Sequence, residues 1–294
     1  MYHLDEFIVP EEDIITTDRI LSFCLGLSDT TQYIKTDYLF HQPSPIIQMN
    51  HWRNINKDVD LRTLRVLVTG HSDYPITESQ RRILDLPSLQ KWFGQNMRIA
   101  HSKAVQIPIG ISNTCPGCSG CAGCVVDSQQ LCHIAALPKP TNPKLAYLNF
   151  SAANCPQERD GIIEEYADKD WVTYQSPSIS EAGHRNFLEM IHSHKFVFAP
   201  RGNGIDTHRM WEALYLRTIP IVKRTEGLSQ FEDLPILFVD SWQDISPQWL
   251  EKQYEEIMST KYPLDKLTLR YWCRRIAEAS RAEDNSQLSP STSR

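Results

Sequence analysis

The chain has 294 residues, of which 41% are hydrophobic and 10% are aromatic, and its formal net charge is -6. These values are typical of a soluble globular protein with room for one large α/β domain or two lobes around a cleft. The negative net charge argues against a nucleic-acid binder, because such a protein is held by a general basic surface.

The N-terminal sequence MYHLDEFIVPEEDIITTD is acidic and lacks the basic start and apolar core of a signal peptide. No run of about 18 apolar residues occurs in the chain, so no membrane span is expected. We therefore expect a cytoplasmic protein. Its eight cysteines should then stay reduced, as thiols or metal ligands rather than disulfides.

The first half of the chain contains few clear elements. Residues 1–60 mix short apolar patches with turns and predict no definite element. LRVLVTG, at 64–70, predicts a buried strand. SLQKWFGQN (88–96) predicts a helix or turn, AVQIPIGIS (104–112) a strand interrupted by proline, and KLAYLNFS (144–151) a third strand.

In the second half, amphipathic helices and apolar strands alternate. Helices are predicted over 157–168, 185–194, 206–216, 246–260 and 264–280, and strands over 195–200, 219–223 and 234–240. Strands alternating with helices of this length indicate βαβ units and a parallel sheet, so the predicted fold class is α/β. The polar residues 281–294 predict a disordered tail.

Polar residues and glycines gather in FVFAPRGNGIDTHRMWEALYLRTIPIV, residues 196–222. The loop PRGNGID follows a strand of the predicted parallel sheet, and ligands bind at that end of such strands. Gly202 and Gly204 predict positive φ angles and a close approach of the backbone to a ligand. Asp206 is a suitable N-cap for a helix starting near Thr207, and the free amides of that helix favour a phosphate group.

Three polar side chains occupy the first turns of this helix. His208, Arg209 and Glu212 are spaced so that they share one helix face. A cation near a helix N-terminus is unfavourable unless an anion is bound there, so Arg209 predicts an anionic ligand. The alternative, with no ligand, is a polar loop followed by a helix with an internal Arg–Glu pair.

The stretch 196–222 resembles the donor-binding segment of exostosin-like glycosyltransferases. That segment has an apolar strand, a Pro/Gly loop, an Arg, and an aromatic-Glu-Ala helix ending in IPIV. VLVTGHSDY, WFGQN, IPIGI and YLNFSAAN resemble the acceptor-side half of soluble, viral or microbial relatives. The resemblance covers about residues 64–240.

This resemblance implies a GT-B architecture, in which two Rossmann-type lobes with parallel sheets face a cleft. Residues 1–150 would form the acceptor-side lobe, trimmed relative to a full Rossmann lobe, with a cysteine-rich insert at 113–133. Residues 151–280 would bind the nucleotide sugar, and 281–294 would be the disordered tail. The implied activity is inverting transfer of a hexosyl or pentosyl group from a nucleotide sugar, by default UDP-linked, to a glycan or glycoprotein acceptor.

The resemblance also implies roles for individual residues. Glu212 would bind the ribose hydroxyls of the donor, and Arg209 would neutralise its diphosphate. The amides of Gly202, Asn203 and Gly204 would cradle the diphosphate, on which charge develops in the transition state. Further candidates for binding this anion are Arg201 and Lys223. The chemistry would require no cofactor.

An inverting enzyme needs a base that removes the proton of the acceptor hydroxyl. The loop after the strand 64–70 offers Asp73 as the first choice and His71 as the second. The alternative is that Asp73 only caps a turn in HSDYP. Further residues expected on the acceptor side are Asn96, Asn149, Ser151 and Arg159.

The sequence CPGCSGCAGC places Cys115, Cys118, Cys121 and Cys124 at three-residue spacing. Such spacing suits a zinc site, and it also occurs in ferredoxin-like clusters, whose electrons a glycosyl transfer does not need. We interpret the segment as a non-catalytic insert, with structural zinc as an alternative. Two other functions remain open: a metal- or redox-linked regulator that uses this cluster, and a non-catalytic module that binds a nucleotide or a sugar.

Overall fold

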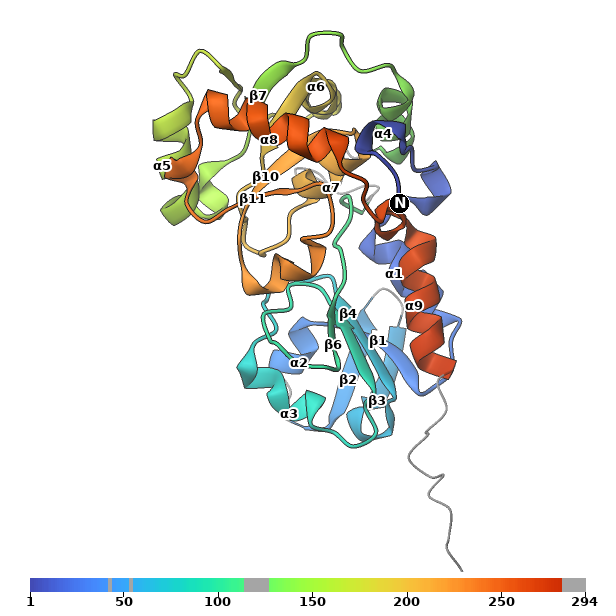
Figure 1. Cartoon of the computed structure of the whole chain (residues 1–294). Coiled ribbons are helices and arrows are strands. Elements are labelled where there is room, and N and C mark those ends of the chain that lie inside the picture. The colour runs from blue at the N-terminus through green and yellow to red at the C-terminus, as the bar shows by residue number, and fades with distance from the viewer. Residues whose placement is uncertain (42–43, 53–54, 114–126, 282–294) are drawn as a thin grey trace, which may run out of the picture.

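The structure, a computed structural model, describes residues 1–41, 44–52, 55–113 and 127–281. The four cysteines of the predicted insert and the predicted tail from residue 282 therefore lie outside the described residues. The described residues form two parallel β-sheets, one in each half of the molecule (Figure 1). None of the helices found in the described ranges is long and apolar enough to cross a membrane.

The first sheet has four parallel strands in the order β1-β4-β5-β6. These strands are β1 (Thr31–Lys35), β4 (Val66–Gly70), β5 (Lys91–Gly94) and β6 (Ala104–Gln106). The helices of this part are α1 (Thr17–Leu25), α2 (Asp37–His41) and α3 (Arg81–Leu84), and an antiparallel hairpin joins β2 (Ile46–Trp52) to β3 (Ile55–Asp60). All five residues of β4 are buried, as expected for a strand covered on both faces.

The second sheet has five parallel strands in the order β11-β10-β9-β7-β8. They are β7 (Lys144–Leu148), β8 (Val172–Tyr174), β9 (His194–Phe198), β10 (Ile219–Lys223) and β11 (Leu237–Val239). The remaining α-helices are α4 (Ser128–Ala136), α5 (Pro156–Tyr166), α6 (Glu181–His192), α7 (His208–Tyr215), α8 (Pro247–Ser259) and α9 (Leu269–Arg281). The parallel pairing and the alternation of strands with helices confirm the predicted α/β fold class.

Short 3-10 helices complete the described elements, at Leu4–Glu6, Glu11–Asp13, Leu61–Thr63, Glu78–Gln80, Ala152–Asn154, Glu226–Phe231, Trp242–Asp244 and Leu264–Leu267. One apolar cluster joins the two lobes. It contains Val68 and Phe93 of the first sheet together with Val197 of the second sheet and Trp211 of α7. The lobes therefore share a continuous hydrophobic core.

The division of the chain between the lobes differs from the predicted one at both ends of the second lobe. β7 begins at Lys144 and belongs to the second sheet, although residues up to 150 were assigned to the first lobe. The helix α9 returns to the first lobe and packs beside α1 (Figure 1). Ser280 of α9 shares a hydrogen bond of 2.7 Å with Thr31 of β1, and Arg270 pairs with the buried Asp13.

Three predictions for the first half of the chain need correction. The middle of the segment 88–96 is the strand β5 and not a helix or turn, and its Trp92 and Phe93 are buried on opposite faces of the sheet. The strand predicted over 104–112 ends at Gln106, before Pro108. Residues 1–60, for which no definite element was predicted, contain α1, β1, α2 and the β2–β3 hairpin.

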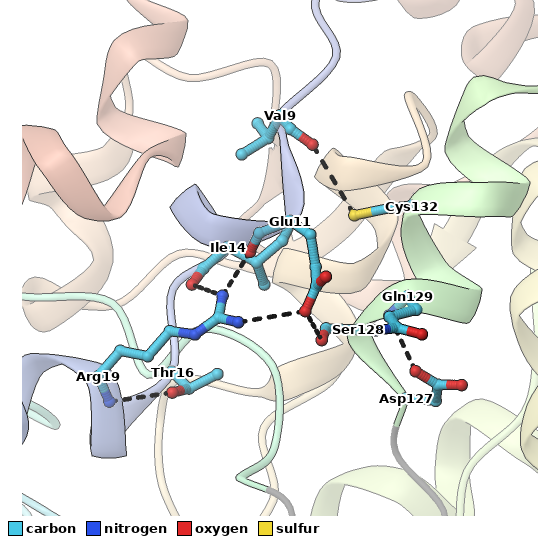
Figure 2. Close-up of polar contacts among 9 residues, drawn as sticks. All are labelled: Val9, Glu11, Ile14, Thr16, Arg19, Asp127, Ser128, Gln129 and Cys132. Atoms are coloured by element: carbon cyan, nitrogen blue, oxygen red, sulfur yellow. Dashed lines mark hydrogen bonds and ion pairs between the residues drawn. The ribbon is translucent and has the colours of Figure 1, made fainter.

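The N-terminal segment is fastened to the start of α4 by a polar network (Figure 2). The Arg19 guanidinium donates to the carbonyl oxygens of Glu11 and Ile14, at 2.9 Å for Ile14. The Ser128 hydroxyl donates to the Glu11 carboxylate at 2.9 Å. Asp127 caps α4 by accepting from the backbone amide of Gln129, also at 2.9 Å. This network fixes where α4 begins.

Two glycines provide a matched test of this architecture. Gly110 has a φ of 66°, and a Cβ atom there would lie 1.9 Å from the Ile15 carbonyl oxygen. Gly110→Ala should therefore lower the free energy of unfolding by about 2 kcal/mol or more. Gly161 lies within α5, where an added Cβ atom would meet nothing within 4 Å, so Gly161→Ala should raise it by about 0.5–1 kcal/mol.

The measurement is urea unfolding followed by circular dichroism, on both variants and on the parent protein. Equal stabilities of the Gly110→Ala variant and the parent would show that the loop at residue 110 does not have the described conformation.

Candidate active site

A cavity of about 400 Å³ lies where the loops of the two lobes meet. Its walls come from the loops that follow β4, β7, β8 and β9, and from the first turns of α6 and α7. The residues predicted from the sequence that line it are Asp73, Asn149, Ser151, Arg159, Gly202, Asn203, Gly204, Asp206, His208, Arg209 and Glu212. The structure thus brings the loop of Asp73 to the loop and helix that begin near Arg201.

The glycines of the loop 200–207 have a different role from the predicted one. Among the described glycines, Gly110 alone has a positive φ, so the prediction for Gly202 and Gly204 was wrong. A Cβ atom on Gly204 would lie 2.7 Å from Oδ1 of Asn96. The Gly202 amide donates to the Gly204 carbonyl oxygen at 3.1 Å. Gly204 therefore leaves room for the Asn96 side chain. The Gly202 amide is already bonded within the loop, so the predicted amide cradle loses this donor.

Asn96 is buried and bridges the two lobes. Its Oδ1 accepts from the amides of Ile205 at 2.9 Å and Asp206 at 3.3 Å, and its Nδ2 donates to the Ser72 carbonyl oxygen at 2.9 Å. Its φ of 54° lies in the left-handed region, which Asn tolerates better than most residues. Asn96 does not line the cavity, so its predicted place on the acceptor side was wrong.

Asp206 is buried, and its side chain connects the two lobes. It is not the N-cap of α7, because Thr207 occupies that position. Its Oδ1 accepts from the Trp211 indole at 2.8 Å, and its Oδ2 accepts from the Ile109 amide at 2.9 Å. Burial raises the pKa of Asp206 to about 7, although the N–H donors of Ile109, Trp211 and Thr207 oppose this shift. Both oxygens accept from these other donors, which explains why the capping prediction failed.

Arg209 lies in the cavity wall without an anionic partner. Its guanidinium lies over the rings of Phe187, at 5.4 Å from the ring centre, and Phe150, at 5.8 Å. Burial, and then the positive charge of Arg159, lower its pKa to about 10. Its Nε is buried without a hydrogen-bond partner among the described residues, and no described carboxylate forms an ion pair with it. Arg209 and Glu212 interact electrostatically, but the internal Arg–Glu pair is not a close ion pair.

Glu212 faces the same cavity and is ionised. Burial alone would raise its pKa, but His184, His208 and Arg209 outweigh burial and hold the pKa below its ordinary value. The Nε2 atom of His184 lies 3.6 Å from the Glu212 carboxylate, and the side chains of the two residues are 10% and 7% exposed. The site therefore offers a buried carboxylate beside a buried cation.

The other predicted cations have different places. Arg159 is buried and donates to the carbonyl oxygens of Ser151 and Arg201, both at 2.8 Å, so it supports the loop beneath the cavity. The Arg201 side chain folds back onto its own loop, donating to the Asn203 carbonyl oxygen at 3.1 Å, and does not line the cavity. Lys223 is exposed at the end of β10 and also lies outside the lining.

Of the two predicted bases, only Asp73 lines this cavity. Asp73 is exposed, and its Oδ2 accepts from Nδ2 of Asn203 at 3.3 Å. The His71 ring lies between the Tyr33 hydroxyl and the Asp18 carboxylate, at 2.6 Å from each, and its side chain is 7% exposed. The structure therefore brings Asp73, but not His71, to the predicted donor loop.

Several residues that line the cavity were not predicted from the sequence, among them His184, Phe187 and Thr207. His184 and Phe187 come from the first two turns of α6, and Thr207 contributes a buried hydroxyl without a partner among the described residues. A signal for α6 did exist, because the helix follows the carboxyl end of β8, an edge strand of the parallel sheet. The first turn of α6 therefore lies at the carboxyl ends of the strands, which is the edge of a parallel sheet where ligands bind.

His208 keeps its predicted place on the first turn of α7 and lines the cavity. Its Nδ1 donates to the carbonyl oxygen of Gly110 at 2.8 Å, which fixes the ring. The ring thereby ties the first turn of α7 to the opposite lobe.

The predicted metal ligands Cys115, Cys118, Cys121 and Cys124 lie outside the described residues. Within the described ranges, no group of three or more His, Cys, Asp or Glu residues is arranged to hold a metal ion. The remaining cysteines, Cys24, Cys132, Cys155 and Cys273, are free thiols.

Two parallel-sheet lobes with a cavity between their loops correspond to the predicted GT-B-like architecture. No family model matches the chain, and no curated protein matches it either. A crystal structure of an alpha1,3-fucosyltransferase aligns with a TM-score of 0.38 at 12% sequence identity, over 75% of this chain and 79% of that one. A match at this level does not identify a function, which must come from the chemistry of the cavity.

The raised pKa of Asp206 predicts a pH dependence of stability. Because the folded state binds this proton more tightly than the unfolded state, the contribution of Asp206 is present near pH 4 and is lost as the pH rises through about 7. The slope from one such group is at most about 1.4 kcal/mol per pH unit. Urea unfolding between pH 5 and 8 should show this component in the parent protein and lack it in Asp206→Asn. Identical pH profiles of the two proteins would contradict the assignment.

Proposed function

We propose that the chain is an inverting glycosyltransferase that takes its sugar from a UDP-linked donor and transfers it to a glycan or glycoprotein acceptor. The main support is the pairing, on one face of α7, of a buried cation without an anionic partner and a buried ionised carboxylate. Arg209 and Glu212 both line the cavity between the lobes. Within this class, the sequence of residues 196–222 supports an exostosin-like member.

The environment of Arg209 suits a diphosphate. A guanidinium withdrawn from water is costly unless an anion is bound, and Arg159 adds a second positive charge to the same wall. The N-terminus of α7, an eight-residue helix, and the unpartnered Thr207 hydroxyl supply further donors. In the transition state negative charge develops on the leaving diphosphate, and donors that are already in place stabilise it.

The environment of Glu212 suits a ribose. An ionised carboxylate accepts hydrogen bonds from two vicinal hydroxyl groups. Glu212 lies three residues after Arg209, which is about 5 Å along a helix axis. In a nucleoside diphosphate the ribose directly adjoins the phosphates, so one ligand can reach both side chains. We therefore assign the nucleotide to the wall formed by α6 and α7.

We propose Asp73 as the base. It lies in the loop after β4, in the opposite lobe from Arg209 and Glu212, and lines the same cavity as these two residues. In a single displacement its carboxylate takes the proton of the acceptor hydroxyl. The acceptor oxygen then bonds to the anomeric carbon as the bond from that carbon to the diphosphate oxygen breaks. Because arginine side chains supply the positive charge, the scheme requires no cofactor, and zinc at the cysteine cluster would be structural.

The ribose assignment predicts a specific loss of nucleotide discrimination. The parent protein should bind UDP about tenfold or more tightly than 2′-deoxy-UDP, because the deoxynucleotide lacks one hydroxyl donor to a charged acceptor. Glu212→Gln should weaken UDP binding and remove most of this difference, as measured by isothermal titration calorimetry. Glu189→Gln, an exposed change on α6, is the control and should behave as the parent. A Glu212→Gln variant that still distinguishes the two nucleotides would rule out the assignment.

The role of Asp73 predicts a separate effect on turnover. Asp73→Asn keeps the size of the side chain but removes its basicity, so turnover should fall by about 100-fold or more while UDP affinity stays unchanged. The assay is UDP release from a set of UDP-sugars with a panel of glycan acceptors, and Asp160→Asn on α5 is the control. Near-normal turnover would transfer the role of base to another group. A product of retained anomeric configuration would reject the single displacement.

A further inference from the structure

We propose that a second cavity, on the far side of Asp73, binds the terminal sugar of the acceptor, and that the ring of this sugar stacks on Tyr74. This inference rests on the proposed function and adds the position and chemical class of the acceptor to it. The cavity has a volume of about 530 Å³ and is lined by Asp37 at the start of α2, by residues 71–75 of the loop after β4, and by Asn203.

The two cavities meet at a shared boundary. Asp73 and Asn203 line both of them and are joined by the hydrogen bond of 3.3 Å between their side chains. A sugar in the second cavity would therefore present a hydroxyl group to Asp73 on one side, with the donor on the other side. This is the arrangement that a single displacement needs, because base and leaving group must lie on opposite sides of the reacting carbon.

Tyr74 provides an aromatic surface in this cavity. It is 50% exposed, which makes it one of the large exposed hydrophobic residues of the first lobe. Its ring is braced by Phe40 of α2, with the ring centres 5.3 Å apart. The Tyr74 amide donates to the Ser72 hydroxyl at 3.1 Å, and that hydroxyl donates to Asp37. A rigid exposed aromatic ring offers an apolar face with little entropy to lose, and the C–H face of a pyranose can cover it.

The polar groups around Tyr74 favour an uncharged sugar. Asp37 and Asp73 both line the cavity and supply acceptors for the hydroxyl groups of a sugar. No lysine or arginine is among the described residues that line the cavity, and the ring of the lining residue His71 is held between the Tyr33 hydroxyl and the Asp18 carboxylate. Asp37 is paired with Lys35, so Asp73 is the carboxylate that would repel a sugar with its own negative charge. The chemical class is therefore a neutral hexopyranose.

The test is saturation-transfer difference NMR on the full chain with saturating UDP. The probes are methyl β-galactopyranoside, methyl β-glucopyranoside, methyl α-mannopyranoside and, as a charged comparison, methyl β-glucuronide. At least one neutral glycoside should receive saturation at its ring C–H protons. Tyr74→Ala should reduce that signal at least fivefold, and Tyr74→Phe should retain it.

Tyr2→Ala is the matched control. Tyr2 is 47% exposed and braced by Phe7 with ring centres 5.1 Å apart, but it lines neither cavity, so its removal should leave the signal unchanged. UDP affinity, measured on every variant, should equal that of the parent and shows that each variant is folded.

Three results would overturn the inference while UDP still binds: no saturation of any neutral glycoside, an unchanged signal in Tyr74→Ala, or stronger saturation of the glucuronide than of the neutral probes. Absence of UDP binding in the parent protein would instead overturn the proposed function, so the two failures can be told apart.

Discussion

The carboxylate of Asp206 holds the loop 200–207 against the opposite lobe, and the geometry of the cavity depends on this contact. One oxygen accepts from Ile109, in the segment that leaves the first sheet, and the other from Trp211 of α7. Asn96 binds the amides of Ile205 and of Asp206 itself, and His208 donates to the Gly110 carbonyl oxygen. The N–H donors offset part of the cost of a buried carboxylate. These few hydrogen bonds therefore fix the two walls of the cavity relative to each other.

The polar groups that connect the lobes have hydrogen-bond partners, whereas several polar groups in the cavity wall have none among the described residues. Arg209 Nε, the Thr207 hydroxyl and His184 Nδ1 are buried without hydrogen-bond partners among the described residues. A buried donor or acceptor that no partner or water satisfies costs about 1–3 kcal/mol. These three groups line one cavity, where a polar ligand could reach them. A polar ligand that satisfies them would recover this free energy, which is how binding energy is stored in a preformed site.

The sequence was most informative where local periodicity decides the structure. Between residues 144 and 240 all the α-helices and every strand but β8 could be predicted, because their apolar runs are long enough to specify their own elements. The strands β1 and β5 could not, because TQYIK and KWFG are short and become strands only by pairing with β4. For Arg209 and Glu212 the helical spacing placed both side chains on one face, and the structure agrees.

Other features of the site depend on partners distant in the sequence. Asp206 has the local pattern of an N-cap, but its partner Ile109 lies 97 residues away. Asn96 meets Ile205 across 109 residues, and no pattern around either residue indicates the other. Local rules gave the elements and part of the chemistry, whereas the bridges between the lobes required the tertiary structure.

The path of α9 has a consequence for how the protein folds as it is synthesised. Ile20 and Leu21 of α1 share a core cluster with Trp272 and Ile276 of α9, so the part of α1 that packs on α9 stays uncovered until residues 269–281 have left the ribosome. Domains usually fold in the order of their synthesis. Here all strands of the second sheet have been synthesised once Val239 is made. The first lobe begins earlier in the sequence, but it is completed later, because it needs α9.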